Sequence, residues 1–346
     1  MAIETIVWEK NSIKIIDQSQ LPLKLEYLYL KEIDQVREAI TSLKIRGAPA
    51  LGIVAALGLM VGIQSSSAQN WLDFREELQK TVNFLRSSRP TAVNLFWALK
   101  RMIRRAEENN ERPILEIKRI LQEEALKILE EDKICNRRIG RKGATLISDG
   151  DTVLTHCNAG ALATADYGTA LGILYRAKEE KKKIRVYVDE TRPLLQGARL
   201  SAWELLQEGF KVTLICDHTA GAVMQEGKID KILVGADRVA ANGDTANKIG
   251  TYTLAVLARE HHIPFYVACP FSTVDLSILG GEKISLEKRS PDEITQINGK
   301  RIAPKGVEVY NPAFDITPAK YITAIITEKG IHRPPFIKTL RDKEGK

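Results

Sequence analysis

The sequence predicts an α/β protein in two parts: a mainly helical part with a small antiparallel sheet, followed by a doubly wound parallel sheet. Apolar residues recur at helical spacing through much of residues 31–147, whereas after Gly150 short apolar strands alternate with amphipathic helices. With 346 residues, the chain also exceeds the size at which one hydrophobic core usually stops growing. We therefore expect one domain over residues 1–147 and a second, Rossmann-like and catalytic, over residues 148–346.

The amino-terminal part begins with short β-rich pieces and then becomes helical. Thr5–Trp8 and Ile13–Ile16 are typical of strands, and the polar residues 10–12 between them favour a turn. Apolar residues at helical spacing predict two later helices, one through Leu95, Leu99, Met102 and Ala106 and one through Ile114, Ile117, Leu121, Ala125 and Ile128.

The carboxyl-terminal part repeats an apolar strand, a small-residue turn and an amphipathic helix. Strands are expected near Val153–His156, Ile184–Asp189, Val212–Asp217, Ile232–Ala236 and Phe265–Ala268, with helical patterns at Ala198–Gln207 and Lys248–Glu260. Residues 280–306 interrupt this repeat with charge, Gly and Pro, and predict an excursion at the sheet edge or a lid. Residues 312–330 are expected to return to helix and to end at Gly330.

Composition narrows the class of protein. The net charge is +7, but both signs are interspersed and no aromatic and basic pattern indicates nucleic-acid binding. The four cysteines lie far apart without zinc-ligand spacing. The longest apolar segment, Ala48–Ile63, is broken by Pro49 and glycines, and no charged and apolar leader opens the chain. We expect a cytoplasmic protein that binds an anionic small molecule and neither membrane nor nucleic acid.

One expected strand ends at a thiol. The apolar run before His156 stops at Cys157, which small residues follow, and ligands of open α/β sheets bind outside the carboxyl ends of strands. A free cysteine is most often an inert buried side chain. An ordinary thiol is only about 3% thiolate at pH 7, so a reactive Cys157 needs a helix N-terminus or a cation nearby. His156 is not an obvious catalytic partner, because neighbours on a strand point to opposite faces.

A second expected strand ends at Asp237, so an acid and a thiol are expected to face one pocket. Taken alone, Asp237 is explained as well by a structural role, as a helix cap or a partner of Arg238, as by a catalytic one. As a proton donor it must keep its proton at pH 7, which costs about 4 kcal/mol unless burial raises the pKa. The side chain of Arg238 is then expected to point elsewhere.

Two helix starts suit a phosphate. Arg46 precedes Gly47 and Ala48, where a small-residue helix begins and offers free backbone N–H groups. Tight helix packing through small residues is the alternative for this segment. Arg89, before another helix, is a weaker candidate of the same kind.

Three residues of the second part suit an oxygen-rich ligand. Asn247 and Lys248 follow the Asp237 strand by one loop at the expected start of a helix, although a helix cap with an exposed lysine is the commoner use of such residues. Gln196 lies in a strand-to-helix loop, where it suits a sugar hydroxyl or is simply a surface glutamine.

Five motifs together carry a resemblance to a known family. They are Arg46-Gly47-Ala48-Pro49-Ala50, Arg89-Pro90-Thr91-Ala92-Val93-Asn94-Leu95, His156-Cys157-Asn158-Ala159-Gly160, Glu190-Thr191-Arg192-Pro193-Leu194-Leu195-Gln196-Gly197 and Gly235-Ala236-Asp237-Arg238. With them the chain resembles the methylthioribose-1-phosphate isomerases, within the larger family that includes the translation initiation factor 2B α, β and δ subunits. The resemblance runs from the amino-terminal strands to Asp315. The run Asp217–Gly221 departs from the family's pattern and puts the local pocket shape in doubt.

The resemblance implies an aldose-ketose isomerase of methionine salvage that converts 5-methylthioribose 1-phosphate to 5-methylthioribulose 1-phosphate. It implies that Cys157 and Asp237 are the catalytic pair, with Asp237 the proton donor, and that no metal or organic cofactor is needed. The implied substrate contacts are Arg46, Gly47, Ala48, Arg89, Gln196, Asn247 and Lys248. The resemblance also implies a homodimer through the carboxyl-terminal domain.

Two other functions remain open at this point. A related isomerase would act on ribose 1,5-bisphosphate or 5-deoxyribose 1-phosphate with the same acid and thiol. A regulatory subunit of the initiation factor 2B type would bind partners and catalyse no sugar chemistry. The presence of both Cys157 and Asp237 argues against the regulatory subunit, because it has no chemical need for the pair.

Overall fold

The computed structural model describes residues 3–90, 92–297 and 299–342, which form two compact units. The first unit comprises the chain up to residue 136 together with residues 160–168, and the second comprises residues 137–159 and the chain from residue 169 onward. Thr91, part of one motif above, lies outside the described residues. Within the described ranges, none of the helices combines the length and the apolar character needed to cross a membrane.

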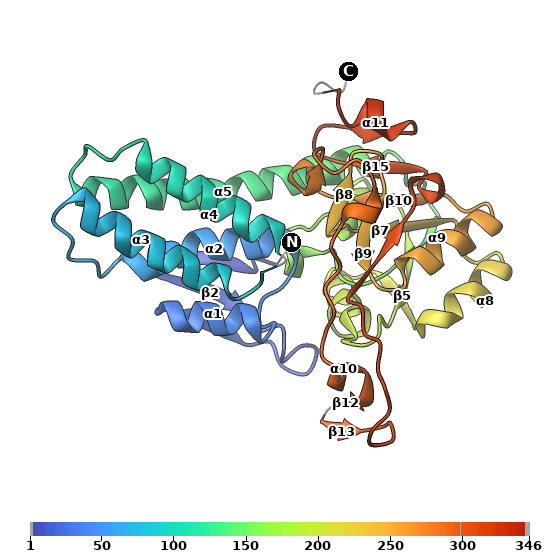
Figure 1. Cartoon of the computed structure of the whole chain (residues 1–346). Coiled ribbons are helices and arrows are strands. Elements are labelled where there is room, and N and C mark those ends of the chain that lie inside the picture. Colours follow the sequence, from blue (N-terminus) through green and yellow to red (C-terminus); the bar gives the residue numbers. More distant parts are fainter. Residues whose placement is uncertain (1–2, 91, 298, 343–346) are drawn as a thin grey trace. The chain divides into compact units, whose positions relative to one another are not determined.

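The first unit combines an antiparallel sheet with long helices (Figure 1). The sheet has the order β1 (Ile6–Glu9), β2 (Ser12–Ile16), β3 (Tyr27–Leu30). The helices are α1 (Ile33–Thr41), α2 (Ala48–Ile63), α3 (Trp71–Arg86), α4 (Val93–Glu107) and α5 (Ile114–Ala144), whose last residues belong to the second unit. Because α2 is apolar on all sides, it is buried along nearly its whole length. The expected faces of α4 and α5 are also buried, apart from the partly buried Ile114.

The second unit is built on a seven-stranded sheet in the order β16-β15-β10-β7-β4-β5-β6. These strands are β4 (Thr152–Thr155), β5 (Arg185–Asp189), β6 (Lys211–Ile215), β7 (Lys231–Val234), β10 (Phe265–Ala268), β15 (Ala324–Ile326) and β16 (Ile331–His332). All neighbours are parallel except β16, which is antiparallel to β15. The chain adds β5 and β6 on one side of β4 and then continues with β7 on the other. The expected doubly wound sheet is therefore confirmed, and its direction switches between β4 and β7.

Helices and a smaller sheet complete the second unit (Figure 1). The helices are α6 (Ala170–Glu179), α7 (Ala202–Gln207), α8 (Ala220–Gln225), α9 (Thr251–Glu260), α10 (Asp292–Thr295) and α11 (Phe336–Thr339). The smaller sheet has the order β11 (Val274–Asp275), β8 (Arg238–Ala240), β9 (Thr245–Lys248), β14 (Phe314–Thr317). Figure 1 shows α10 and the hairpin of β12 (Gln296–Ile297) and β13 (Lys300–Arg301) extending away from both sheets. This is the expected excursion, and its role as a lid stays a prediction.

The helix expected over residues 312–330 is wrong. The segment forms β14, a 3-10 turn at Ala319–Tyr321 and the fully buried strand β15. Pro318 has no N–H to continue a helix. The isoleucines of β15 are buried between β16 and β10, and this burial outweighs the helical spacing of the apolar residues. Tertiary packing therefore overrides the periodicity of this stretch.

The start of the helix expected at Lys248 is also wrong. Asn247 and Lys248 are the last residues of β9, where they pair with Asp315 and Phe314 of β14, and α9 begins only at Thr251. Cross-strand pairing in the smaller sheet fixes these two residues in extended conformation. Neither β8 nor β9 is evident from the sequence pattern, because both are short.

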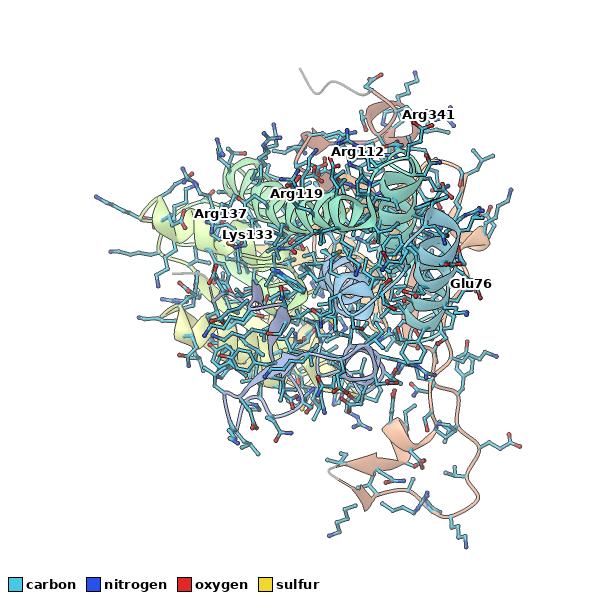
Figure 2. The ribbon with its side chains drawn as sticks, turned by 90° about the vertical axis from the view of Figure 1, so that its left-hand side faces the viewer. Glu76, Arg112, Arg119, Lys133, Arg137 and Arg341 are labelled. Atoms are coloured by element: carbon cyan, nitrogen blue, oxygen red, sulfur yellow. The ribbon has the colours of Figure 1, made fainter. Side chains whose placement is uncertain are left out.

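The surface of the first unit carries charges of both signs. Figure 2 shows Arg112, Arg119 and Lys133 just before and along α5. Arg112 and Arg119 each pair with a glutamate four residues later, and Lys133 lies 3.2 Å from the carboxylate of Glu4. Exposed pairs of this kind add little stability, but they neutralise the positive charge of the helix surface.

Candidate functional site

The expected thiol and acid both lie at the topological switch of the large sheet. Cys157 follows β4 and Asp237 follows β7, and these two strands are parallel neighbours. The segments that carry them are in contact, because a Cβ placed on Gly235 would lie only 2.7 Å from the Cβ of Ala159. In doubly wound sheets the crevice at this switch is where ligands bind.

Cys157 is half-buried and is held in an unusual backbone conformation. Its φ of 63° lies in the left-handed region, which non-glycine residues rarely adopt. Its N–H donates to Oγ1 of Thr191 at 2.9 Å, and its carbonyl accepts from Oγ of Ser201 at 2.6 Å. Backbone strain at one residue persists when its surroundings fix it in this way. The side chain of Cys157 is therefore aimed by the loop and the helix that follow β5.

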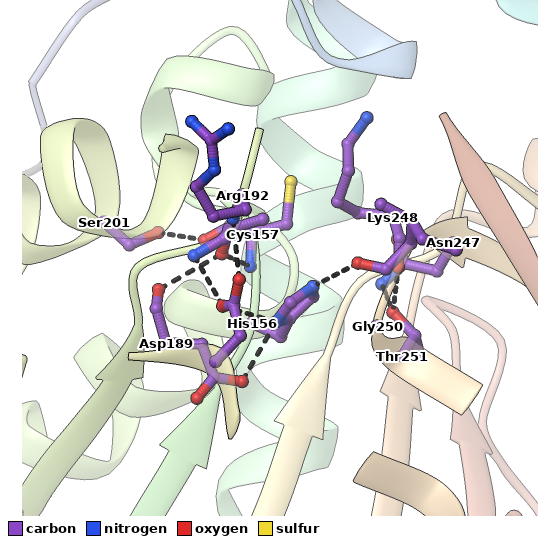
Figure 3. Close-up of polar contacts among 12 residues, drawn as sticks. His156, Cys157, Asp189, Arg192, Ser201, Asn247, Lys248, Gly250 and Thr251 are labelled. Carbon is purple, nitrogen blue, oxygen red and sulfur yellow. Dashed lines mark hydrogen bonds and ion pairs between the residues drawn. The ribbon is translucent and has the colours of Figure 1, made fainter. Parts of the chain in front are cut away.

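The charges near the thiol come from side chains. Two backbone N–H groups at the start of α6, those of Thr169 and Leu171, donate to the carbonyl of Ala159. Figure 3 shows the side chains of Arg192 and Lys248 extending to the same side as the sulfur of Cys157. Of the two activators expected from the sequence, the arrangement favours a cation over a helix N-terminus.

The loop after β5 is fixed by Asp217. The two oxygens of its carboxylate accept from the backbone N–H groups of Thr191 and Arg192, each at 2.7 Å. The guanidinium of Arg192 donates to the carbonyls of Pro193 and of Ile294 in α10, both at 3.1 Å. The run that departs from the family's pattern thus begins with the residue that makes these contacts.

Gln196 is buried next to this loop, with only 5% of its surface exposed. Its Oε1 is fully buried and accepts no hydrogen bond from any residue that the structure describes. An acceptor that stays unsatisfied in the interior costs about 1–3 kcal/mol. Gln196 is therefore not the surface glutamine that the sequence left open, and a hydroxyl donor from a ligand would satisfy its oxygen.

The opposite side of the site is formed by the end of β9. Lys248 is 8% exposed, and its Nζ lies 4.6 Å from the centre of the Phe314 ring. The amide of Asn247 donates to Oγ1 of Thr251 at 3.0 Å, and this hydroxyl donates to the carbonyl of Lys248 at 2.6 Å. These bonds join the strand end to the first residue of α9 and orient the side chain of Asn247. Lys248 is not the exposed lysine of the alternative interpretation.

Beside Asp237, the side chain of Arg238 points away, as expected. One guanidinium nitrogen of Arg238 donates to the carboxylate of Asp275 in β11. Asp237 itself is half-buried, and its backbone N–H donates to the carbonyl of Ala246 at 2.9 Å. The two sheets of the unit thus meet at this residue.

A buried polar cluster that the sequence analysis missed lies beneath Cys157. Nδ1 of His156 lies 2.9 Å from Oδ2 of Asp189, and its Nε2 lies 2.8 Å from the carbonyl oxygen of Ile249 (Figure 3). Oδ1 of Asp217 is 3.9 Å from Nδ1. The only sequence signal for this cluster is that polar residues end three adjacent strands, β4, β5 and β6.

Electrostatics in this cluster favour protonated groups. Burial alone would lower the pKa of His156, but the hydrogen bond and charge of Asp189 and the charge of Asp217 raise it above the ordinary value. Burial raises the pKa of Asp189 to about 6, although His156 opposes this shift. Atoms of these three residues approach one another closely enough to hold a metal ion. Since both ring nitrogens already face hydrogen-bond partners, we assign the cluster to hydrogen bonding.

The first unit holds the remaining predicted ligands at two adjacent helix starts. Gly47 caps α2 with a φ of 97°, and a Cβ there would lie 2.5 Å from backbone atoms of Ala163, so only glycine fits. A Cβ on Gly52 would lie 3.0 Å from the carbonyl oxygen of Asn94, which shows that the first turns of α2 and α4 pack together. Arg46 and Arg89 precede these two turns.

The predicted site residues thus fall in both units. The second unit contains Cys157, Gln196, Asp237, Asn247 and Lys248, and the first contains Arg46, Gly47, Ala48 and Arg89. In the second unit, Cys157 and Asp237 follow strands, whereas Asn247 and Lys248 end β9 instead of starting a helix. In the first unit, the residues lie at helix starts.

Comparisons with known proteins agree with one another. Residues 44–334 match the model of the initiation factor 2 subunit family. A methylthioribose-1-phosphate isomerase from Acetivibrio thermocellus is 55% identical over 95% of this chain and 96% of its own. Among solved structures, the 5-methylthioribose 1-phosphate isomerase of Pyrococcus horikoshii is 47% identical, with a TM-score of 0.92 over 98% of this chain and 95% of that one.

A second solved structure carries a different description. It is the A. fulgidus protein described as translation initiation factor eIF-2B subunit delta, which is 44% identical, with a TM-score of 0.89 over 99% of each chain. Family membership therefore includes proteins described as enzymes and proteins described as translation factors. This chain belongs to the initiation factor 2 subunit family and, within it, to the methylthioribose-1-phosphate isomerases.

Proposed function

We propose that this chain converts 5-methylthioribose 1-phosphate to 5-methylthioribulose 1-phosphate, with Cys157 and Asp237 as the catalytic pair. The observation that carries the proposal is the position of both residues at the β4/β7 switch, where a ligand crevice is expected. The relatives named above supply the substrate class.

The chemistry explains why an acid and a thiol are needed. The phosphate on C1 blocks the free aldehyde that ordinary sugar isomerases use, so the ring opens with the phosphate attached. The bond between C1 and the ring oxygen breaks while this oxygen takes a proton from Asp237. One hydrogen then moves from C2 to C1, and the C2 hydroxyl loses its proton as its oxygen becomes the carbonyl. This loss balances the proton that Asp237 gave to the ring oxygen. Cys157 assists this transfer, whether the hydrogen moves as a proton through an enediol or as a hydride.

Substrate binding is assigned to the remaining site residues. Arg46, Arg89 and the backbone N–H groups at Gly47 and Ala48 suit the phosphate, since helix starts and guanidinium groups both bind such anions. In the second unit, Lys248 adds a cation and Asn247 an amide, and the unsatisfied Oε1 of Gln196 suits a sugar hydroxyl. We propose no metal or organic cofactor for this reaction.

The test is turnover of purified protein with three substrates: 5-methylthioribose 1-phosphate, ribose 1,5-bisphosphate and 5-deoxyribose 1-phosphate. We expect the first to have the highest kcat/KM. Cys157→Ser and Asp237→Asn are each expected to lose about 100-fold or more of kcat while remaining folded, because positioned acid-base groups contribute about 100- to 10,000-fold. Arg238→Gln, one residue from Asp237, is the matched control and is expected to keep most activity.

Two results would change this assignment. A clear preference for the bisphosphate would make the chain a related sugar-phosphate isomerase. No turnover of any of the three substrates would favour the regulatory role, which the description of the A. fulgidus relative supports. We further propose a cytoplasmic homodimer that associates through the second unit, and a light-scattering mass equal to one chain would refute the dimer.

A further inference from the structure

His156 is a buried titratable residue that the chemistry above does not use. Only 2% of its surface is exposed, and it lies next to Cys157 in sequence. Figure 3 shows the two side chains on opposite sides, with the imidazole on the side of Asp189 and the sulfur on the other.

The partners of the imidazole fix its protonation. Nε2 faces the carbonyl oxygen of Ile249, which can only accept a hydrogen bond, and Nδ1 faces the carboxylate of Asp189. Both nitrogens donate only when the ring is an imidazolium. Three acids surround the ring: Asp189 at the end of β5, Asp217 after β6 and Asp315 on β14. A cationic ring offsets one of these nearby negative charges, whereas a neutral ring offsets none.

One ring nitrogen determines the position of the Lys248 segment. The peptide group between Ile249 and Gly250 is held at both ends, because its carbonyl accepts from His156 and its N–H donates to Oδ2 of Asp315 at 2.7 Å. This peptide immediately follows Lys248. The ring also packs closely here, since a Cβ on Gly250 would lie 2.9 Å from Cε1 of His156.

The other ring nitrogen lies on the side of the Cys157 segment. It contacts the carboxylate of Asp189. The hydroxyl of Thr191 donates to the backbone carbonyl of Asp189 at 3.1 Å, and Oγ1 of Thr191 in turn accepts from the N–H of Cys157. Asp217, 3.9 Å from the ring, holds the backbone of Thr191 as well. His156 thus contacts both the residues that hold the backbone of Cys157 and the peptide that follows Lys248.

We propose that His156 is a positioning residue, held as an imidazolium, that fixes the segment of Cys157 and the segment of Lys248 relative to each other. The expected effect of His156 on turnover rests on the proposed isomerase function. The expected charge of the ring does not. A misplacement of about 1 Å between reacting groups costs about 100-fold in rate, so a side chain that touches no substrate still controls turnover.

The first test is independent of activity. Nitrogen-15 NMR of the histidine rings in the intact protein distinguishes protonated from unprotonated ring nitrogens, and the chain has only five histidines. We expect both nitrogens of His156 to be protonated at pH 7, with the signal assigned by its loss in a His156→Asn variant. A ring with one unprotonated nitrogen at pH 7 would overturn the proposal.

The second test measures kinetics. We expect His156→Asn to reduce kcat/KM for 5-methylthioribose 1-phosphate about 100-fold, through both a lower kcat and a higher KM, because two segments move. His262→Gln, at an exposed histidine after α9, is the control and is expected to leave both constants unchanged. Unchanged kcat/KM in a folded His156→Asn protein would refute the positioning role.

The two tests separate failure of this proposal from failure of the proposed function. If the native protein does not turn over the substrate, the function is wrong, and the NMR result still decides the state of the ring. If the native protein is active and the ring is singly protonated, only the inference about His156 is wrong. If His156→Asn does not fold, the ring spectrum of the native protein remains decisive.

Discussion

Two buried histidines of the second unit have different partners and opposite pKa shifts. His156 lies between the carboxylate of Asp189 and a backbone carbonyl, and its pKa is raised. In His332, Nδ1 lies 2.7 Å from the carbonyl oxygen of Thr339, and Nε2 lies 3.0 Å from Oγ1 of Thr327. Burial lowers the pKa of His332 below its ordinary value. Each ring faces one backbone carbonyl, so the other partner decides the difference.

The hydroxyl of Thr327 can donate where a carboxylate cannot. Its Oγ1 already accepts from the N–H of Lys329 at 3.1 Å, which leaves its proton for Nε2 of His332. A neutral ring with its proton on Nδ1 therefore satisfies every partner of His332. At His156 no partner can donate unless Asp189 takes up a proton. A single carboxylate thus converts a structural histidine into a buried cation, and this cation lies at the candidate active site.

The largest expected loss of stability comes from giving His156 an uncharged partner, as His332 has. Asp189→Asn keeps an acceptor for Nδ1 of His156 but removes the charge from a residue that is fully buried. Breaking a buried charged pair costs about 3–5 kcal/mol, so we expect a loss of about 3 kcal/mol in the free energy of unfolding by urea. The pKa of His156 should fall at the same time, and ring NMR should show one unprotonated nitrogen at neutral pH.

Asp230→Asn is the control for this substitution. Asp230 also accepts a backbone hydrogen bond, from Thr152, but it is exposed and outside the cluster. We expect it to cost about 1 kcal/mol or less. Equal losses in the two variants, with an unchanged ring spectrum for His156, would mean that Asp189 does not determine the charge of the ring.

A smaller effect is expected where the backbone meets the ring. Gly250→Ala has two effects. It puts a side chain on a residue with a φ of 104°, which strains the backbone, and it places a methyl group 2.9 Å from Cε1 of His156, so the ring must move. Gly150→Ala is the matched control, because its φ is 90° and nothing lies within 4 Å of its Cβ. The backbone term alone costs about 1–2 kcal/mol in both variants.

Only Gly250→Ala is expected to reduce turnover, by about 10-fold or more, because only there does His156 have to move. The measurements are urea unfolding and kcat/KM on both variants. If Gly250→Ala matched Gly150→Ala in stability and in kcat/KM, the contact between residue 250 and His156 would affect neither stability nor turnover.

The same comparison shows what the sequence can and cannot predict. Cys157 and Asp237 could be predicted to lie at the same sheet edge because each follows an apolar strand, which is a local pattern. The bonds of His156 could not be predicted, since its partners Asp189 and Ile249 are 33 and 93 residues away along the chain. β8 and β9 were not predicted because both are short. Periodicity suggested helix over residues 312–330, where pairing between distant strands determines the structure.

Long-range pairing also explains why the two ligand groups were predicted unequally. Arg46 and Arg89 lie at helix starts that Pro and small residues mark in the sequence, and the helices begin where expected. Asn247 and Lys248 were assigned to a helix but lie on β9, because their conformation depends on β14. Their identity as candidates came from the family motif and the strand-end position rather than from the local structure.

The smallest expected effect is the acid dependence of stability. Since folding lowers the pKa of His332, the native chain binds fewer protons there than the unfolded chain below about pH 6.5, so this residue destabilises the fold as the pH falls. His156 acts in the opposite sense: its raised pKa contributes stability that is present below about pH 6.5 and is lost as the pH rises through the raised value. We therefore expect His332→Gln to lose less stability than the native protein between pH 7 and pH 5, measured by urea unfolding. If His332→Gln instead lost as much stability as the native protein or more, His332 would not be a buried neutral ring. The hydroxyl of Thr327 would then not explain why His332 differs from His156.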